Sequence, residues 1–309
     1  MFQLTFFVAQ TNMSELQGVS AMTVTRDVKL GRGSYGTVIR VFWNGSTYAL
    51  KILDASEKDC KCEAEAYKRV GKLLPCKKFA ILHKPTQHTT SDAVSLTPAA
   101  VLLQLYKGDC SNKNCPKDFR FLSELLKEVM RDFERLHKKG WVHNDVKCQN
   151  ILFGEHGEKP SLADWGLSKR INSRTGIGKF RYGPWAVHTQ KGGRVFADSD
   201  FRALVVTLME IVTGKRCFTE YRGVHTISNK HRDLISHFFA EDPDTQTAVL
   251  KAVDDAVSLD QNDAEDSSSV RATFGHDVHK KNLEKIIQCL ELVNSMHDLT
   301  ETLSNWVLA

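Results

Sequence analysis

Hydrophobic and polar residues alternate with a period of two over most of the first third of the chain. The alternating or wholly apolar stretches lie at residues 24–30, 37–43, 46–53, 79–83 and 99–105. This period is typical of β-strands, and Asn44-Gly45 between two of the stretches favours a tight hairpin turn. The pattern therefore predicts a small antiparallel sheet in this part of the chain.

The hydrophobic period lengthens to three and four residues in the remainder of the chain, which predicts helices. The strongest such pattern runs from Phe119 to Leu136 and ends at Lys138-Lys139-Gly140, a typical helix end. Other helical patterns lie at residues 62–70, 198–213, 231–240 and 283–293. A sheet followed by a mainly helical region indicates the α+β class.

Two segments show neither pattern. Residues 1–23 have no clear period and are predicted to form a loose N-terminal leader. Residues 254–269 are acidic and become rich in serine, a composition that favours a mobile segment.

The composition is that of an ordinary globular protein, with 41% hydrophobic and 26% charged residues among 309 and a net charge of +5. No apolar run is long enough to span a membrane, and the N-terminus lacks the basic leader of a signal peptide. Eight cysteines in so long a chain do not make a disulfide scaffold, and reduced thiols indicate an intracellular location, in cytoplasm or nucleus. Cys110 and Cys115 have no second pair at zinc spacing nearby, so we expect no zinc site there. The mild charge gives no direct indication of a nucleic-acid partner, and the oligomeric state is open.

One stretch, residues 141–153, has apolar ends and a polar centre. Val142 enters it and Ile151-Leu152-Phe153 leave it, with Asp145, Lys147 and Asn150 between them. Apolar flanks of this kind anchor a loop in a core and hold its polar centre where it can act. Asp145 and Asn150 are close enough in sequence for one turn of loop to aim a carboxylate and an amide at the same small volume.

A second stretch is rich in glycine and joins the first two predicted strands. It reads Leu30, Gly31, Arg32, Gly33, Ser34, Tyr35, Gly36, Thr37 and Val38. Glycines at these places let the backbone approach phosphate groups closely, which a Cβ atom would prevent. In a dinucleotide-binding fold this motif would open a helix, but here a β pattern continues on both sides.

In this order and spacing, the motifs resemble those of eukaryotic-type protein kinases. Residues 141–153 are similar to the catalytic loop His-Arg-Asp-Leu-x-x-x-x-Asn, and Asp164-Trp165-Gly166 is similar to the metal-binding Asp-Phe-Gly. The resemblance covers roughly residues 24–215. It implies a two-lobed kinase-like α+β fold, with a sheet lobe at 24–107 and a mainly helical lobe at 108–309.

The resemblance also implies cofactors and site residues. ATP and Mg²⁺ would be the cofactors, and Lys51 in Tyr48-Ala49-Leu50-Lys51 would hold the α- and β-phosphates. Glu63 would pair with Lys51, and Glu65 is the alternative. Further nucleotide contacts are expected from the glycine-rich stretch and from Ala49, Gln104, Leu105, Tyr106 and Lys107.

The catalytic-loop residues take family roles by the same resemblance. Asp145 would be the catalytic base, and Asn150 and Asp164 would bind the metal. Lys147 would steady the γ-phosphate, which favours serine/threonine over tyrosine specificity in protein substrates. Asp200 would support the backbone of the catalytic loop, the alternative being a plain helix-capping carboxylate.

The chain departs from the family pattern in two places. Asn144 replaces the arginine that binds a phosphorylated activation loop, and residues 178–185 match the family's substrate-docking motif only in part. Such divergence, with a short large lobe, resembles kinases of large DNA viruses. Two other functions stay open: a pseudokinase that acts as a nucleotide-binding scaffold, and a small-molecule kinase of the aminoglycoside type. The intact Lys51 and Asp145 disfavour the first, and Lys147 disfavours the second.

Residues 165–197 contain no acidic side chain. Their basic residues are Lys169, Arg170, Arg174, Lys179, Arg181, Lys191 and Arg194. In kinases this segment lies beside the bound peptide, so we expect a preference for protein substrates with acidic or phosphorylated neighbours. Ser267-Ser268-Ser269, which follow acidic residues, are a candidate autophosphorylation site. The alternative is a basic loop that is merely solvated.

Overall fold

The computed structural model describes residues 3–8, 20–33, 36–43, 45–53, 56–74, 79–85, 96–154, 158–173, 195–214, 229–262 and 278–307. The chain forms two compact units, of which residues 1–106 with 165–167 make the first and residues 107–164 with 168–309 make the second. The first is built mainly of strands and the second mainly of helices, which confirms the predicted two-lobed α+β class.

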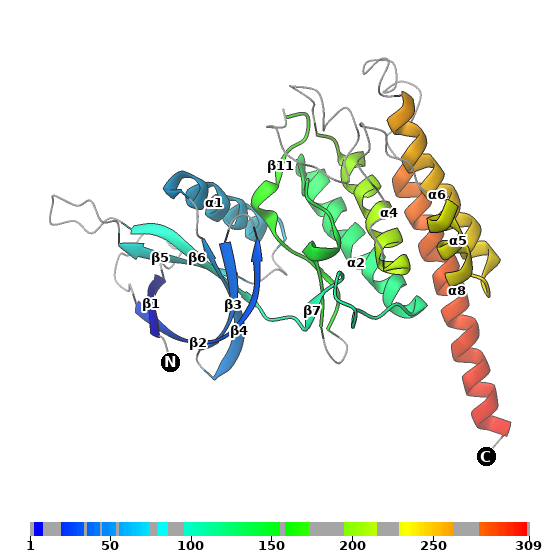
Figure 1. Cartoon of the computed structure of the whole chain (residues 1–309), viewed down its shortest axis with the longest axis horizontal. Helices are drawn as coiled ribbons and strands as arrows, with labels where there is room; N and C mark the ends of the chain where they lie inside the picture. Colours follow the sequence, from blue (N-terminus) through cyan, green and yellow to red (C-terminus); the bar gives the residue numbers. More distant parts are fainter. Residues whose placement is uncertain are drawn as a thin grey trace. The chain divides into compact units, whose positions relative to one another are not determined.

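The strands of the first unit form a closed antiparallel barrel in the order β1-β2-β3-β4-β6-β5 (Figure 1). They are β1 (Gln3–Val8), β2 (Ser20–Gly33), β3 (Gly36–Trp43), β4 (Ser46–Leu53), β5 (Phe79–Pro85) and β6 (Leu96–Gln104). β2 to β6 confirm the strands predicted from the alternating pattern. Their inward side chains form one apolar cluster that includes Ile39, Val41, Leu50, Leu82 and Ala100.

The prediction of a loose leader at residues 1–23 is wrong in its described parts. Gln3–Val8 is strand β1, which pairs with the beginning of β2 from Gln3↔Thr25 to Val8↔Ser20. β1 also pairs with β5 at Phe7↔His83 and so closes the barrel. Six residues are too few to reveal a period, but a neighbouring strand edge satisfies their backbone groups and makes them a strand.

Helix α1 (Glu57–Leu73) packs its apolar face against strands β5 and β6 of the barrel. It begins after Ser56, whose hydroxyl accepts the backbone N–H of Asp59 at 3.2 Å and caps the first turn. Ala64, Tyr67 and Val70 recur at helical spacing on this face and are almost fully buried. The short 3₁₀ helix η2 (Trp165–Leu167) also packs against α1.

The second unit is organised around α2 (Phe119–Lys138) and α4 (Ala197–Thr213). Asp118 caps α2 by accepting the N–H of Phe121 at 2.9 Å, and Gly214 ends α4 in the left-handed conformation at φ 65°. The other helices are α5 (Asn229–Phe238), α6 (Pro243–Asn262) and α8 (Val278–Val307). Short strands and one 3₁₀ turn complete the unit: β7 (Gly108–Asp109), β8 (Trp141–Val142), η1 (Cys148–Asn150), β9 (Ile151–Phe153), β10 (Ser161–Leu162) and β11 (Lys169–Arg170).

The predicted mobile segment at 254–269 begins too early. α6 continues through it as far as Asn262, and residues 263–269 lie outside the described residues. Val253 and Ala256 are fully buried, so this part of α6 belongs to the core despite its acidic side chains. Asp254 is exposed, whereas Asp255 pairs with Lys251 of the same helix at 2.9 Å and accepts a hydrogen bond from Asn282 of α8 at 2.7 Å.

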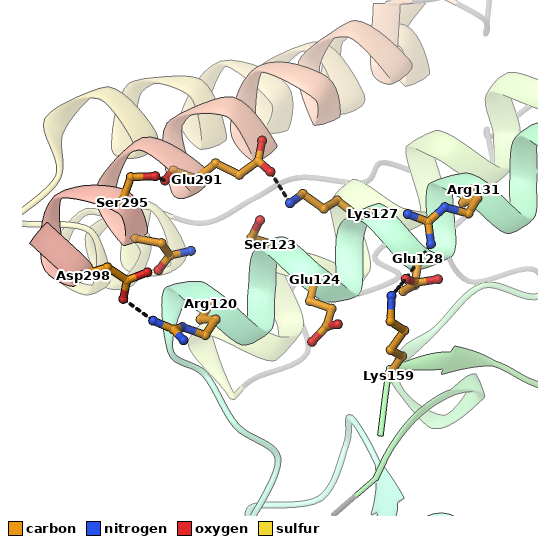
Figure 2. A pocket seen from close by; sticks show the side chains of 11 residues that line it. Arg120, Ser123, Glu124, Lys127, Glu128, Arg131, Lys159, Glu291, Ser295 and Asp298 are labelled. Atoms are coloured by element: carbon orange, nitrogen blue, oxygen red, sulfur yellow. Dashed lines mark hydrogen bonds and ion pairs between the residues drawn. The ribbon is translucent and has the colours of Figure 1, made fainter. Parts of the chain in front are cut away.

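A polar groove of about 500 Å³ lies where α8 crosses α2 (Figure 2). Most of its charged side chains pair with one another: Arg120 with Asp298, Lys127 with Glu291, and both Arg131 and Lys159 with Glu128. Most of these side chains are well exposed, so each pair contributes little to stability.

Among the described residues, no helix combines the length and the apolar content that crossing a membrane requires.

A buried polar cluster joins α4, α6 and α8. His279 of α8 is fully buried, and its Nε2 lies 3.6 Å from Oδ2 of Asp198. Arg202 of α4 is 2% exposed and donates from Nε to the carbonyl of Ala256 at 2.8 Å. Burial, with a smaller contribution from the charge of Arg202 and an opposing one from Asp255, lowers the pKa of His279 from 6.5 to about 4.

This shift predicts an acid-sensitive fold. Above pH 6.5 His279 is neutral in both the folded and unfolded chain. As the pH falls from 6.5 towards 4, His279 becomes protonated in the unfolded chain but stays neutral in the folded chain. The free energy of unfolding therefore falls. We expect His279 to contribute a loss of about 2 kcal/mol in unfolding free energy between pH 7 and pH 5. Urea unfolding at both pH values measures it, and His279→Leu should lose less stability on acidification than the wild type. An equal loss in both proteins would contradict the prediction.

Candidate active site

Lys51 and Glu63 form a buried ion pair in the first unit. Lys51 lies on β4 and Glu63 on the buried face of α1, with 2.6 Å between Nζ and Oε1. Both residues are less than a tenth exposed, and breaking such a pair by removing one partner commonly costs about 3–5 kcal/mol. Glu65 points to solvent and pairs with Lys68 at 2.8 Å, so Glu63 is the partner of Lys51.

The described part of the glycine-rich stretch lies on β2 and β3, and Gly33 pairs with Gly36. Ser34 and Tyr35 lie outside the described residues. A Cβ at Gly36 would come within 1.9 Å of the carbonyl oxygen of Ile52, so packing against β4 requires glycine there. A Cβ at Gly31 would meet nothing within 4 Å, so packing does not explain that glycine. Open space at Gly31 fits the approach of a phosphate to the backbone.

The remaining residues predicted to contact the nucleotide lie on β4 and at the end of β6. Ala49 on β4 is buried, Gln104 is exposed, and Leu105 and Tyr106 are half-buried. The backbone N–H of Lys107 donates to the carbonyl of Phe153 at 3.0 Å, within the second unit. This N–H is therefore engaged within the second unit, and the nucleotide contacts of residues 104–107 stay a prediction.

Asp145, Lys147 and Asn150 converge in the second unit. Nζ of Lys147 lies 2.7 Å from Oδ2 of Asp145. Nδ2 of Asn150 donates to the same Oδ2 at 2.9 Å and to the carbonyl of Asp145 at 2.7 Å. The loop therefore aims a carboxylate, an ammonium and an amide at one volume, and the two donors fix the carboxylate.

Asp200, on the first turn of α4, holds the backbone of this loop. Its two carboxylate oxygens accept the N–H groups of His143 at 2.8 Å and Asn144 at 2.9 Å. Nε2 of His137, on α2, lies 2.9 Å from the same carboxylate. Asp200 is 1% exposed, and both of its carboxylate oxygens accept N–H groups of the loop, so the predicted support of the loop is confirmed.

His143 is a site residue that sequence reasoning left without a role. Its Nδ1 accepts the N–H of Asp145 at 3.2 Å, and its Nε2 faces the carbonyl of Ala163 at 3.0 Å. A ring nitrogen that accepts carries no proton, so the proton is on Nε2 and is donated to Ala163. The histidine of the loop motif was the available signal, but one of its two partners, Ala163, is distant in sequence.

A backbone hydrogen bond also joins the segment around Asp164 to the loop. The N–H of Ala163 donates to the carbonyl of Asn150 at 2.8 Å. Asp164 has a left-handed backbone at φ 60°, and so does Asn144 at φ 67°. This conformation is costly for most residues and is often found where a side chain must be aimed. Asn is among the residues that tolerate it best.

The oxygens of Asn150 and Asp164 are of the kind that Mg²⁺ prefers. Both N–H groups of the Asn150 amide are engaged with Asp145, so its Oδ1 is the atom left for a cation. In the described ranges, no group of three or more His, Cys, Asp or Glu side chains could hold a metal.

The sequence-family model of the protein kinase domain matches residues 24–297 of the chain. Mitogen-activated protein kinase kinase kinase 1 of Arabidopsis thaliana is 25% identical over 229 residues, which are 70% of this chain and 36% of that protein. A probable serine/threonine-protein kinase of Dictyostelium discoideum is 25% identical over 207 residues, 64% of this chain and 22% of that protein. Ribosomal protein S6 kinase 2 beta of Xenopus laevis is 27% identical over 158 residues, 48% of this chain and 23% of that protein. The chain thus spans well under half the length of these relatives.

The positive φ of Asn144 leads to a prediction about which substitutions at this position destabilise the fold. Asn144→Gly keeps the left-handed conformation available, whereas Asn144→Val places a β-branched residue where it strongly disfavours that conformation. Both variants lose the same amide side chain, so their difference isolates the backbone. We expect the valine variant to be less stable than the glycine variant by about 1 kcal/mol or more in urea unfolding. Equal stabilities would show that the loop does not need this conformation.

Proposed function

The chain belongs to the protein kinase family, and from this membership we propose that it is an active serine/threonine kinase. It would transfer the γ-phosphate of ATP to hydroxyl groups of protein substrates. The observation that carries the proposal is the convergence of Asp145, Lys147 and Asn150 on one volume.

Asp145 is suited to act as the base. Its Oδ2 is occupied by Lys147 and Asn150, and no described residue donates to its Oδ1. Oδ1 would therefore orient the substrate hydroxyl and receive its proton. Lys147, held against Asp145, would stabilise negative charge on the transferred phosphoryl group. Phosphoryl transfer depends mainly on such positioning and charge compensation.

ATP with Mg²⁺ would supply the phosphoryl group and neutralise its charge. Lys51, oriented by Glu63, would hold phosphate oxygens in the first unit. Oδ1 of Asn150 and the carboxylate of Asp164 would hold the cation. Asp200 and His143 act on the backbone of the loop, and they are positioning residues in this proposal.

Serine/threonine specificity is favoured by Lys147 and by the name of the Dictyostelium relative. We also propose a preference for acidic sites. Of the basic residues in 165–197, the structure describes Lys169 and Arg170, and within the described residues neither forms an ion pair. Burial lowers the pKa of Lys169, as expected for a cation without a carboxylate neighbour, and exposed Arg170 lies over Trp141 at 5.2 Å. Ser267–Ser269, the autophosphorylation candidate, lie outside the described residues.

The catalytic prediction concerns Lys51, Asp145 and Asp164. Alanine at any one of them should lower the rate of phosphoryl transfer by about 10²-fold or more, the scale of losing a positioned catalytic group. The measurement is transfer from labelled ATP to a panel of proteins and small molecules, with circular dichroism as a check on folding. Glu63→Gln and Glu65→Gln form a matched pair on α1, and only the former should lower the rate.

The same assay separates the alternatives. Undiminished transfer by Asp145→Ala would remove the proposal. Nucleotide binding without transfer would instead support a pseudokinase, and transfer to small molecules alone would support the aminoglycoside type.

The substrate prediction concerns charge. On a peptide array at low salt, acidic or phosphorylated neighbours should raise the phosphorylation of a serine several-fold over basic neighbours, and added salt should reduce the difference. Arg170→Gln should weaken the preference. Arg131→Gln is the matched control, because Arg131 is paired with Glu128 at 2.6 Å on α2. If acidic peptides are no better than basic ones, the basic segment is merely solvated.

A further inference from the structure

Helix α8 exposes large apolar side chains beyond the part that packs on its own unit. Leu283, Ile286 and Leu290 are fully buried in the second unit, where α8 contacts α2, α4 and α6. Leu292 is 60% exposed and Met296 is 62% exposed, the highest values for large apolar side chains among the described residues. Single exposed leucines are common, but a row of apolar residues usually marks a surface that another molecule covers.

The two exposed residues begin a regular row along the helix. The sequence continues it with Leu299, Leu303 and Trp306, so apolar residues recur at steps of four and three from residue 292 to residue 306 of α8. Positions at these steps lie along one side of a helix, and the same steps form the seam of a coiled coil. Positions 292, 296, 299, 303 and 306 are here called the α8 stripe.

The side of α8 that faces its own unit is polar at this level. Glu291, Ser295 and Asp298 line the polar groove where α8 crosses α2 (Figure 2). The exposed side carries Leu292 and Met296 instead. An ordinary surface helix has the reverse arrangement, with its apolar side on the core and its polar side in water.

The exposed side of α8 changes character at Leu292. Gln288 and Lys285, four and seven residues earlier, lie on the same side of the helix and are exposed as well. That side is therefore polar before the stripe and apolar along it. Figure 1 shows the last part of α8 running beyond the other helices of the second unit. These features indicate that water covers the first part of this side and a second apolar surface covers the stripe.

The residues beside the stripe favour an identical helix as that second surface. In a coiled coil, charged residues on either side of the seam select the partner, and like charges there repel an identical chain. The flanking positions 293, 295, 300, 302 and 307 carry only valine, serine or threonine. Two identical stripes can therefore meet without repulsion, and the flanks hold no charge that would select a different helix.

We propose that two copies of the chain pair through their α8 stripes. The first part of α8 is anchored in the second unit, so pairing does not have to meet the cost of starting a helix. The stripe extends over about 21 Å at the rise of an α-helix, which is two heptads. Such an interface is small, so we expect a reversible dimer whose population rises with protein concentration. The pairing does not depend on the proposed kinase function.

Sedimentation of the full chain over a range of concentrations measures the pairing. We expect a monomer–dimer equilibrium in the wild type. Leu292→Glu should raise the dissociation constant by more than about tenfold, because each copy would bring a charge into the seam. Gln288→Glu is the matched control, since it adds the same charge to the same exposed side one turn before the stripe and should change the constant far less. Both positions are exposed, so circular dichroism should show that both variants fold.

A second variant, Leu299→Cys, locates the interface. Position 299 is the middle of the stripe, so it meets its counterpart whether the two helices run parallel or antiparallel. Under mild oxidation we expect a covalent dimer linked through residue 299, identified by mass spectrometry of its peptides. Gln288→Cys, outside the stripe, should form far less of such a dimer.

Three results would overturn the proposal. The first is a wild-type protein that stays monomeric at every concentration, in which case the stripe faces a different protein or a lipid surface. The second is a dimer that Leu292→Glu leaves as stable as before. The third is a covalent dimer linked only through cysteines other than the one at position 299. The link through residue 299 decides the matter if Leu292→Glu does not fold.

Discussion

One buried carboxylate, that of Asp200, holds the loop of the candidate active site in place. A polar loop cannot be anchored by apolar packing alone, because its backbone N–H groups need partners wherever they are shielded from water. Asp200 accepts two of them, from His143 and Asn144, and meets His137 of α2. Burying the charge is costly, and these three donors offset that cost. Removal of the carboxylate would break the hydrogen bonds that join α4, which carries Asp200, to the loop and to α2.

The remaining geometry of the loop follows from this anchor. With residues 143 and 144 fixed, His143 can accept the N–H of Asp145 and donate to Ala163, which precedes Asp164. Asn150 then turns both amide hydrogens towards Asp145 and leaves its oxygen for a cation. Strained backbone at Asn144 and Asp164 is tolerated because hydrogen bonds on either side determine it. Strain and anchoring together place the Asp145 carboxylate, the Lys147 ammonium and the Asn150 amide in one unit.

Much of the fold and most of the candidate site could be predicted from the chain. The alternating strands, the apolar face of α2 and the order of the motifs are local properties, and the structure reproduces them. The failures have a common cause. Strand β1 is too short to show a period and exists because β2 and β5 pair with it. The acidic composition near the end of α6 predicts a mobile segment, yet Val253 and Ala256 are buried in the core. In both, distant residues outweigh local composition.

By itself, the sequence determined the family and the types of chemical group at the site, because residue identity and spacing are written directly in the chain. It could not decide between Glu63 and Glu65 as the partner of Lys51, since both lie on one helix and only packing buries one of them. Nor could it reveal that the N–H of Lys107 donates to the carbonyl of Phe153, or that the N–H of Cys110 donates to the carbonyl of Ile151. Such facts depend on hydrogen bonds between segments and on burial, and these exist only after the chain has folded.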